Sequence, residues 1–589
     1  MIVGYGVTDV TIIRRPHVIF HHHCGKGDLP QPTPRALSQC GHACSRFVVN
    51  ARLTTGHNQG RCSFLCGSFV NIARCELFDF DTSNNIFRPI SMHAITPTRE
   101  ENYSEWYQQV ISEADLAEVS PVRGCMIIKP LGYGLWETMQ RHLDRMFKET
   151  GHQNVYFPLF IPLSFFEKEA EHVEGFAKEC AVVTHRRLEA DLNGGLMPSG
   201  ALEEPLIVRP TSETIIGAAF AKWIQSYRDL PLLLNQWCNV VRWEMRTRLF
   251  LRSSEFLWQE GHTAHASEAE AREETMRMLA IYVRFAHDYL AIPVVAGEKC
   301  AWERFPGADN TYSIEAMMQD GKALQAGTSH FLGQHFAKAA GIQFQNAAGD
   351  LNYVWTTSWG VSTRLIGALI MAHADDDGMV IPPRVAPCHA VILPIYRNSD
   401  DAERVMAYCQ RLKDALCALP YHEGSVEASI DSRALRGGDK VWSHIKRGIP
   451  LRIEVGPRDL DAGTVMVGRR DRLPKQKEAM TQADLVAQIT TILDEMQAHY
   501  FQRAKQFQDA KTCCITDKAT FKQFFAGEEN AVSGGFALCP FVDAPAVRDA
   551  LAAAKVTVRC IPFEQPGRRA TCFFTGQTTD QWALLAKAY

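Results

Sequence analysis

The stretch that decides the fold is Phe256-Leu-Trp-Gln-Glu-Gly-His262. Successive side chains of a β-strand point to opposite faces, so every second residue shares one face: Phe256, Trp258, Glu260 and His262. Two aromatic rings, a carboxylate and an imidazole form a pocket floor that suits an apolar ring bearing a cationic nitrogen. The same pattern is typical of a buried strand whose glutamate and histidine make only structural hydrogen bonds. The strand alone does not decide between these two interpretations.

Arginines occur at positions from which they can reach the same pocket. Arg242 and Glu244 alternate onto one face of the preceding predicted strand, and Arg252 begins the returning strand. Arg364, two residues after Ser362, opens a predicted helix. Because guanidinium groups bind phosphate and carboxylate oxygens, arginines from three chain regions suit a polyphosphate such as ATP. Taken alone, each of them is most typical of a solvated surface charge.

Two common nucleotide-binding motifs do not occur in the sequence. It contains neither Gly-x4-Gly-Lys-Ser/Thr nor Gly-x-Gly-x-x-Gly after a predicted strand. P-loop and Rossmann sites are therefore not supported. If a nucleotide binds, antiparallel strands and arginines hold it.

Length and composition indicate a folded protein of several domains. The chain has 589 residues, of which 46% are hydrophobic and 22% charged, and its formal net charge is −4. At roughly 150 residues per domain, three to four domains are predicted. The composition excludes a collagen-like or largely disordered chain, and no apolar run approaches the ~18 residues of a membrane span. Most of the 18 cysteines are scattered, which is typical of free thiols in a cytosolic protein.

Residues 1–100 differ from the rest of the chain in charge and regularity. Residues 1–75 carry one lysine and seven arginines against two aspartates. Such a change in charge marks a boundary. The segment lacks a clear amphipathic period, and we interpret it as a disordered extension or as a reading frame begun too far upstream, with Met92 as the start.

Two other interpretations of this segment stay open. Cys40-x3-Cys44 and Cys62-x3-Cys66, with histidines nearby, resemble the ligand spacing of a zinc site. Few acids and many arginines are also typical of a transit peptide. The first twenty residues do not have the layout of a secretory signal.

From about residue 103 the hydrophobic pattern becomes regular and predicts both helices and strands. Long, mostly antiparallel strands are predicted at 232–245 and 249–265, joined by a short basic loop. A buried strand is predicted at 155–162, and Thr211 is predicted to lie in the N-cap region of a helix. After residue 387, short strands alternate with helices, which predicts a small, mostly parallel α/β domain.

Longer motifs occur in a fixed order, and with them the sequence resembles the class II aminoacyl-tRNA synthetases, more narrowly the prolyl-tRNA synthetases of the eukaryotic and archaeal type. The match covers about 103–589. The class motifs are the helix 135–150 with the strand ending at Pro158, then Arg242-Trp-Glu244 with Phe250–His262, then Gly360–Gly367. The prolyl-type signatures are Arg209-Pro-Thr-Ser-Glu213, Leu234–Arg242 and Gly327–Gly333.

The resemblance implies an α/β multidomain fold. Residues 103–385 would form a class II synthetase catalytic core on an antiparallel sheet, and 386–495 an α/β anticodon-binding domain. Residues 496–589 would form a small α+β C-terminal domain of the prolyl type, and 1–100 an extension. In this family the first class motif lies at a dimer interface, so a homodimer is implied.

The resemblance also implies roles for individual residues. Those that would bind proline are Thr211, Glu213, Arg242, Phe256, Trp258, Glu260, His262 and His330. Those that would bind ATP are Arg242, Glu244, Arg252, Leu257, Gln325, Thr328, Ser362 and Arg364. Arg242 and Arg364 would be the catalytic residues that stabilise charge on the reacting phosphate, and Mg²⁺ would bind with ATP near Gln325 and Thr328.

The implied reaction is the ATP-dependent ligation of L-proline to tRNA(Pro) through a prolyl-adenylate, in the cytoplasm and without a membrane partner. Sister synthetases for threonine or histidine are alternatives, but Thr211, Glu213 and the strand 256–262 favour proline. A catalytically inactive paralogue acting as a binding protein is a further alternative. It should have lost a phosphate-binding arginine, whereas Arg252 and Arg364 are both present beside Arg242.

The sequence departs from the family pattern near its C-terminal end. Members often hold zinc through two groups of cysteines, but Cys539 lacks its companion and Cys572 has no second cysteine close by. Cys560 is unpaired by spacing. We therefore expect no intact zinc site. The interval between the second and third motifs leaves no room for the large editing insertion of bacterial-type relatives.

Three arginines lie in runs that resemble the anticodon-binding domain: Arg458, Arg469 and Arg470. They would meet RNA phosphates or bases. Surface charge on an α/β domain explains each of them equally well.

Overall fold

The computed structural model describes residues 63–66, 76–81, 86–90, 94–167, 179–526 and 534–589. The chain divides into two compact units, Met1–Ala94 and Ile95–Tyr589. In the first unit the strands β1 (Ser63–Cys66), β2 (Glu76–Asp81) and β3 (Ile86–Ile90) form an antiparallel sheet. The possible zinc ligands Cys40, Cys44 and Cys62, and the suggested start at Met92, lie outside the described residues. The interpretation of residues 1–100 as an extension stays a prediction.

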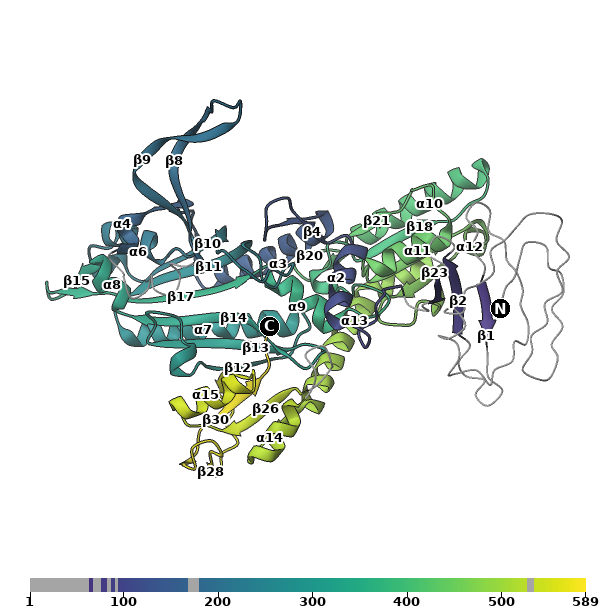
Figure 1. Ribbon diagram of the computed structural model, residues 1–589. Helices are drawn as coiled ribbons and strands as arrows, with labels where there is room; N and C mark the ends of the chain where they lie inside the picture. The colour runs from purple at the N-terminus through teal and green to yellow at the C-terminus, as the bar shows by residue number, and fades with distance from the viewer. Residues whose placement is uncertain (1–62, 67–75, 82–85, 91–93, 168–178, 527–533) are drawn as a thin grey trace. The chain divides into compact units, whose positions relative to one another are not determined.

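The second unit is built around a long sheet (Figure 1). Its catalytic part consists of six antiparallel strands, with a short parallel strand β6 at the edge, which confirms the expected antiparallel core. In spatial order these strands are β12 (Val294–Glu298), β13 (Asn310–Met317), β14 (Ala323–Gly333), β17 (Trp355–Ser362), β11 (Glu255–His265), β10 (Leu232–Val241) and β6 (Gln153–Asn154).

Two predicted strands are shorter in the structure than in the sequence analysis. The pairing of β10 with β11 ends at Val241 and Glu255, so the connecting loop is longer than the basic tripeptide predicted. Phe250 in this loop has φ 62°, a backbone conformation that no strand contains. The predicted strand 155–162 is only partly correct: β7 (Phe160–Pro162) is the part of it that forms a strand, and Tyr156 is 69% exposed. Pro158 has no N–H to donate to a sheet, which explains the interruption.

The strand β7 pairs with a hairpin of two long strands, β8 (Ala181–Ala190) and β9 (Leu196–Val208). This hairpin projects away from the sheet at the top of Figure 1. Smaller elements complete the catalytic part: β4 (Ala117–Val119), β5 (Met126–Ile128), α4 (Leu163–Glu167), α6 (Glu213–Trp223), α8 (His335–Ala340), β15 (Gln343–Gln345) and β16 (Leu351–Tyr353).

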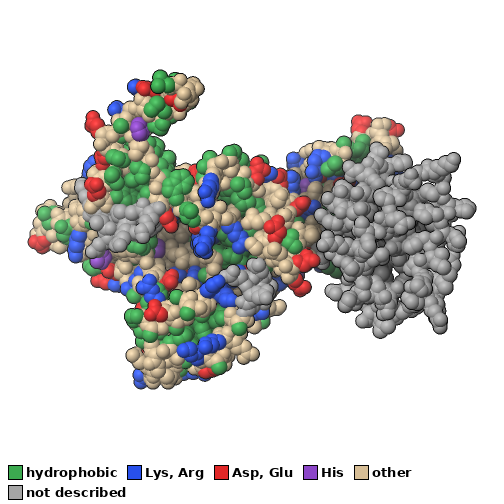
Figure 2. Space-filling view, in the orientation of Figure 1, with side chains coloured by type: hydrophobic (Ala, Val, Ile, Leu, Met, Phe, Trp, Pro, Cys, Tyr) green, Lys and Arg blue, Asp and Glu red, His purple; other side chains and the backbone are tan. Residues whose placement is uncertain are grey.

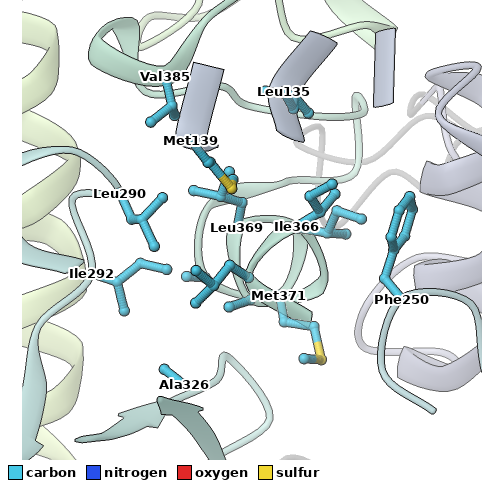
Figure 3. Packing of buried hydrophobic residues seen from close by; sticks show 14 of the residues in the cluster. Leu135, Met139, Phe250, Leu290, Ile292, Ala326, Ile366, Leu369, Met371 and Val385 are labelled. Atoms are coloured by element: carbon cyan, nitrogen blue, oxygen red, sulfur yellow. The ribbon is translucent and has the colours of Figure 1, made fainter. Parts of the chain in front are cut away.

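The hydrophobic core of the catalytic part surrounds one helix. α9 (Arg364–His373) follows β17 directly, and every residue from Leu365 to His373 is buried, as expected for a helix enclosed by protein. Figure 3 shows Ile366 and Leu369 of this helix among side chains from α3 (Pro130–Glu149) and the chain around Leu290. The neighbouring helices are α2 (Tyr103–Glu113) and α7 (Glu268–Asp288). This packing fixes the start of α9, and therefore Arg364, beside the end of β17.

Residues 390–510 form a second sheet with mixed strand directions. β18 (Ala390–Pro394) pairs in parallel with β21 (Ala428–Ile430) and β22 (Leu451–Val455), but β23 (Thr464–Arg469) and β24 (Lys477–Thr481) are antiparallel. The prediction of a mostly parallel domain is therefore only half correct. The link between β22 and β23 holds just α12 (Pro457–Ala462), which is too short for a parallel crossover. The other helices are α10 (Ser399–Cys417), α11 (Gly437–Lys446) and α13 (Gln482–Ala510).

The C-terminal part continues the catalytic sheet. Its strands are β25 (Thr512–Cys514), β26 (Phe536–Pro540), β27 (Thr557–Pro562) and β30 (Trp582–Ala586), with short β28 (Ala570–Thr571) and β29 (Thr578–Thr579) and the helices α14 (Lys518–Phe525) and α15 (Pro545–Ala553). β27 pairs antiparallel with β12 at Gly297. A Cβ at Gly297 would lie 2.3 Å from the carbonyl oxygen of Ile561, so only glycine permits this contact. No described helix is both long and apolar enough to span a bilayer.

Replacing Leu369 with alanine should destabilise the catalytic part strongly, because the cavity left in this enclosed core cannot collapse. We expect a loss of about 2–5 kcal/mol, measured as a lower urea midpoint of tryptophan fluorescence. The matched control is Leu351→Ala, at a side chain that is 66% exposed, where a change within about 0.5 kcal/mol is expected. Equal shifts of both midpoints would contradict the assignment of α9 as the centre of the core.

Candidate functional site

A pocket of about 300 Å³ opens between β11, β14, β17 and the start of α6. Most of the residues that the sequence analysis assigned to proline and ATP line it: Thr211, Glu213, Arg242, Phe256, Trp258, Glu260, His262, Gln325, Thr328, His330, Ser362 and Arg364. They come from distant parts of the chain, and the sheet brings them together. Their individual roles stay predictions.

Three assigned residues do not line the pocket. Glu244 and Arg252 lie in the loop between β10 and β11, where their side chains are 3.8 Å apart. The side chain of Leu257 packs against the main hydrophobic core, because it points to the opposite face of β11 from its two neighbours. Its carbonyl oxygen accepts a hydrogen bond from Thr363 N at 3.0 Å. The nucleotide-binding roles of these three residues are untested.

The floor of the pocket follows the predicted alternation of β11. Phe256, Trp258, Glu260 and His262 all line the pocket. Gln259, between them, points the other way and accepts a 2.6 Å hydrogen bond from the Tyr282 hydroxyl in the core. The register of β11 thus separates pocket side chains from core side chains.

Glu260 is the centre of a buried hydrogen-bond network. Its Oε1 accepts from Ser212 Oγ at 2.5 Å and from Gln236 Nε2 at 2.8 Å, and its Oε2 lies 3.1 Å from His262 Nε2. Burial by itself would raise the pKa of Glu260, but the hydrogen bonds from His262, Ser212 and Gln236 outweigh it and lower that pKa. Burial would lower the pKa of His262, yet Glu260 and Glu213 raise it. The two side chains therefore form an ion pair.

Sequence reasoning missed Ser212 and Gln236 in this network. The signal for Gln236 was available, because it lies directly opposite Glu260 in the β10–β11 register, and facing residues on neighbouring strands interact. Thr211 lies in the N-cap region of α6, as predicted. The N-cap residue itself is Ser212, and its side chain makes no capping hydrogen bond. The Ser212 hydroxyl is used by Glu260 instead.

Thr211 and Glu213 lie together at the opening of α6. The Thr211 hydroxyl donates to Glu213 Oε2, and both side chains are buried. A buried carboxylate with an adjacent hydroxyl provides the acceptors that an ammonium group requires. The sequence-predicted pair is thus close in space and borders the pocket.

The arginines give the pocket its positive wall. Arg242 Nε donates to the carbonyl oxygen of Pro210 at 2.9 Å, and its guanidinium lies 5.6 Å from the Phe256 ring and 5.4 Å from the Trp258 ring. Burial, together with the positive charges of Arg252 and Arg242, lowers the pKa of Arg364 to about 10. Burial also lowers the pKa of Arg242, although the negative charges of Glu213 and Glu260 act in the opposite direction.

His330 borders the pocket as a neutral imidazole. Burial, followed by the charges of His262 and Lys299, lowers the pKa of His330 to about 3. Its Nδ1 lies 3.0 Å from Thr311 Oγ1, and its ring centroid is 4.7 Å from that of Phe305. Thr311, Phe305 and Lys299 also line the pocket and were not predicted from the sequence.

Metal donors in this pocket are few. Among the described residues no group of three or more His, Cys, Asp or Glu side chains is arranged to hold a metal ion. The amide oxygen of Gln325 and the hydroxyl of Thr328 are donors of the kind that Mg²⁺ prefers. They fit an ion that arrives with the phosphates of a nucleotide, because Mg²⁺ usually takes only one or two protein ligands.

Two of the arginines expected to meet RNA are occupied elsewhere. Arg470 is 4% exposed and donates to both carboxylate oxygens of Asp375, at 2.7 and 2.6 Å, so its predicted contact with RNA is wrong. Arg469 pairs with Asp471 and Glu495. Arg458 is exposed at the start of α12.

Family models match three consecutive parts of the chain. Residues 199–373 match the tRNA synthetase class II core domain (G, H, P, S and T), and 389–492 match the anticodon binding domain. Residues 528–589 match the prolyl-tRNA synthetase C-terminal domain. The first model is shared by synthetases of five amino-acid specificities, whereas the third is specific to the prolyl type.

The chain matches nearly the whole length of several similar proteins. Proline--tRNA ligase of Bdellovibrio bacteriovorus is 60% identical over 496 residues, which is 84% of this chain and 99% of the relative. Proline--tRNA ligase of Rhodopirellula baltica is 61% identical over 497 residues, 84% of this chain and 98% of the relative. Proline--tRNA ligase 2 of Anaeromyxobacter dehalogenans is 60% identical over 504 residues, with the same coverage. Together with the pocket and the three matched domains, these identities place the chain in the prolyl-tRNA synthetase family of class II.

Proposed function

We propose that this protein ligates L-proline to tRNA(Pro) in two steps, with ATP as the energy source and prolyl-adenylate as the intermediate. The observation that carries the proposal is one pocket that joins an ammonium site, an aromatic floor and a wall of arginines. Proline supplies a cationic nitrogen in an apolar ring, and ATP supplies the polyphosphate. The class II fold by itself does not require an ammonium site, an aromatic floor and a wall of arginines in one pocket.

The proline end of the pocket orients the amino acid. Glu213 and Thr211 accept hydrogen bonds from the ammonium group, and the ring lies against Trp258 and Phe256. The Glu260–His262 ion pair keeps the floor of the pocket rigid, because each partner is held by the other. Arg242, above both aromatic rings, reaches the proline carboxylate and the α-phosphate of ATP.

Charge stabilisation then drives the chemistry. A carboxylate oxygen of proline attacks the α-phosphorus of ATP, and the bond from that phosphorus to pyrophosphate breaks. Arg242 and Arg364 stabilise the negative charge that develops on the phosphate oxygens, while Mg²⁺ bound with ATP would add positive charge there. In the second step the terminal hydroxyl of tRNA attacks the prolyl carbonyl carbon, and AMP leaves. Alignment within the pocket supplies much of the rate, and no side chain becomes covalently attached.

The anticodon end of tRNA would bind the sheet of residues 390–481. A second cavity of about 740 Å³ is lined by Arg472, Lys475 and Lys477 together with side chains of α13. Arg458 adds an exposed positive charge to the same domain. Lysine and arginine at such a surface bind RNA phosphates.

We further propose a cytoplasmic homodimer with the domain arrangement of the eukaryotic and archaeal type. Support for this type is that residues 266–354 are used by core elements from α7 to β16, so that no segment is left for an inserted domain. Support for the dimer is the group of exposed hydrophobic side chains around the first class motif, including Tyr133, Tyr156 and Phe160. Figure 2 shows hydrophobic side chains at the surface along the adjoining β8–β9 hairpin. Exposed apolar surface of this extent is typical of an interface.

Arg242→Ala should nearly abolish adenylate formation. Loss of one donor to the transition state costs about 3 kcal/mol, which is roughly a hundredfold in rate. ATP–pyrophosphate exchange with proline measures it, and Arg228→Ala, at an exposed arginine, is the matched control. Near-normal exchange by a folded Arg242→Ala variant would remove Arg242 from the site.

The protein should also activate cysteine or alanine measurably. A pocket built for a five-membered ring cannot exclude a smaller amino acid, and Thr211 with Glu213 holds an amine that every amino acid carries. Each missing methylene then lowers kcat/KM only about ten- to two-hundredfold. Exchange is measured with saturating cysteine or alanine. No detectable exchange with both, at a sensitivity of about one part in 10⁵, would mean that another mechanism rejects them.

In solution the protein should have twice the 66.0 kDa mass of one chain, as measured by light scattering. Tyr156→Asp should shift it towards the monomer, because a carboxylate in a dry interface is costly. The matched control is Leu473→Asp, which is equally exposed but lies in the anticodon-binding part. A monomeric wild type, or a Tyr156→Asp variant as dimeric as the control, would contradict an interface at the first motif.

A further inference from the structure

A buried group of three charges lies beside the pocket. Lys299 Nζ donates to Glu315 Oε1 at 2.8 Å, and Arg559 donates to Glu315 Oε2 from Nε at 3.0 Å and from Nη2 at 2.9 Å. The Ser313 hydroxyl donates to Glu315 Oε1 at 2.8 Å. Exposure is 2% for Lys299, 0% for Glu315 and 8% for Arg559. Burying three charges costs free energy that only close pairing offsets, so the positions of the three side chains depend on one another.

The three residues come from two domains. Lys299 directly follows β12 and Glu315 lies in β13, whereas Arg559 lies in β27 of the C-terminal part. Lys299 Nζ also donates to the carbonyl oxygen of Arg559 at 2.6 Å. Close by, the backbone N–H of Ala301 donates to Asp543 Oδ2 at 3.0 Å. The C-terminal part therefore holds both the side chain of Lys299 and the backbone that follows it.

This backbone is a wall of the pocket. Lys299 and Phe305 line the pocket, as does Thr311. The N–H groups of Lys299 and Phe305 both bond to Thr311, at its carbonyl oxygen (2.8 Å) and its hydroxyl (2.9 Å). The Thr311 hydroxyl also contacts His330. A displacement of Lys299 would thus shift Thr311 and, through its hydroxyl, His330.

We propose that Arg559 is a positioning residue for amino-acid activation: by holding Glu315 it fixes Lys299 and the pocket wall 299–305, so that docking of the C-terminal domain completes the pocket. The proposal rests on the proposed function. Arg559 itself does not line the pocket. It acts through Lys299, which does.

The charge balance decides which substitutions are informative. Two cations share one carboxylate, so replacing either cation with methionine leaves one buried ion pair. Replacing Glu315 would instead leave two buried cations without a counter-charge, which strongly destabilises a protein. Arg559→Met and Lys299→Met are therefore the useful variants. Arg548→Met, at an exposed arginine of α15 in the same domain, is the matched control.

The experiment compares the full-length wild type and the three single variants. Kinetics of ATP–pyrophosphate exchange are measured with proline and ATP varied separately, alongside Tm. Arg559→Met and Lys299→Met should each lower kcat/KM roughly ten- to hundredfold, as small misplacements in a pocket do. Arg548→Met should match the wild type.

Two outcomes would overturn the proposal: normal kcat/KM in Arg559→Met, or a loss in Arg559→Met without one in Lys299→Met. A lower Tm alone, with unchanged kcat/KM, would leave Arg559 a purely structural role. If Arg559→Met does not fold, Arg559→Lys takes its place, since it keeps the charge but loses the two-pronged contact. Absence of proline-dependent exchange in the wild type would refute the proposed function instead.

Discussion

The pairing of β10 with β11 is the constraint on which the pocket depends. It places Gln236 opposite Glu260, and the alternation of β11 sends Trp258 and His262 to the same face as Glu260. A slip of one residue would turn these side chains into the core and bring Gln259 into the pocket. The hydrogen bond from Tyr282 to Gln259 opposes such a slip, because the slip would break this bond and leave a buried amide unpaired. Core and pocket therefore specify the register together.

Local pattern was sufficient for the parts of the site that lie on one strand or at one helix start. The period of two in β11 predicted four pocket residues, and Arg364 was predicted at the opening of α9. Sequence was insufficient where long-range pairing decides. The guanidinium of Arg470 is held by Asp375, almost a hundred residues away in the sequence. The hydroxyl of Ser212 is likewise held by the distant Glu260. The prediction of a strand at 155–162 rested on its hydrophobic residues, whereas Pro158 lacks the N–H that a strand donates to its neighbour.

The pocket combines two electrostatic designs. On one side, Glu260 is paired with the charge of His262, and the Glu213 carboxylate accepts a hydrogen bond from the Thr211 hydroxyl. On the other side, Arg242 and Arg364 repel each other, and burial together with neighbouring positive charge lowers the pKa of Arg364 to about 10. The first arrangement favours the charged forms of its side chains, whereas in the second, burial and neighbouring positive charge disfavour the charged form of Arg364.

The continuity of the sheet from β12 to β27 and β30 also affects how the newly synthesised chain folds. Chains emerge from the ribosome N-terminus first, and domains generally fold as units in that order. The outer side of β12 is nevertheless paired by β27, and Ala323 at the start of β14 bonds to the backbone of Lys587 and Tyr589. A nascent chain that has already formed β10 to β17 therefore still has an open sheet edge at β12. The last eighty residues close that edge as they are released, much as a final strand closes a sheet during refolding.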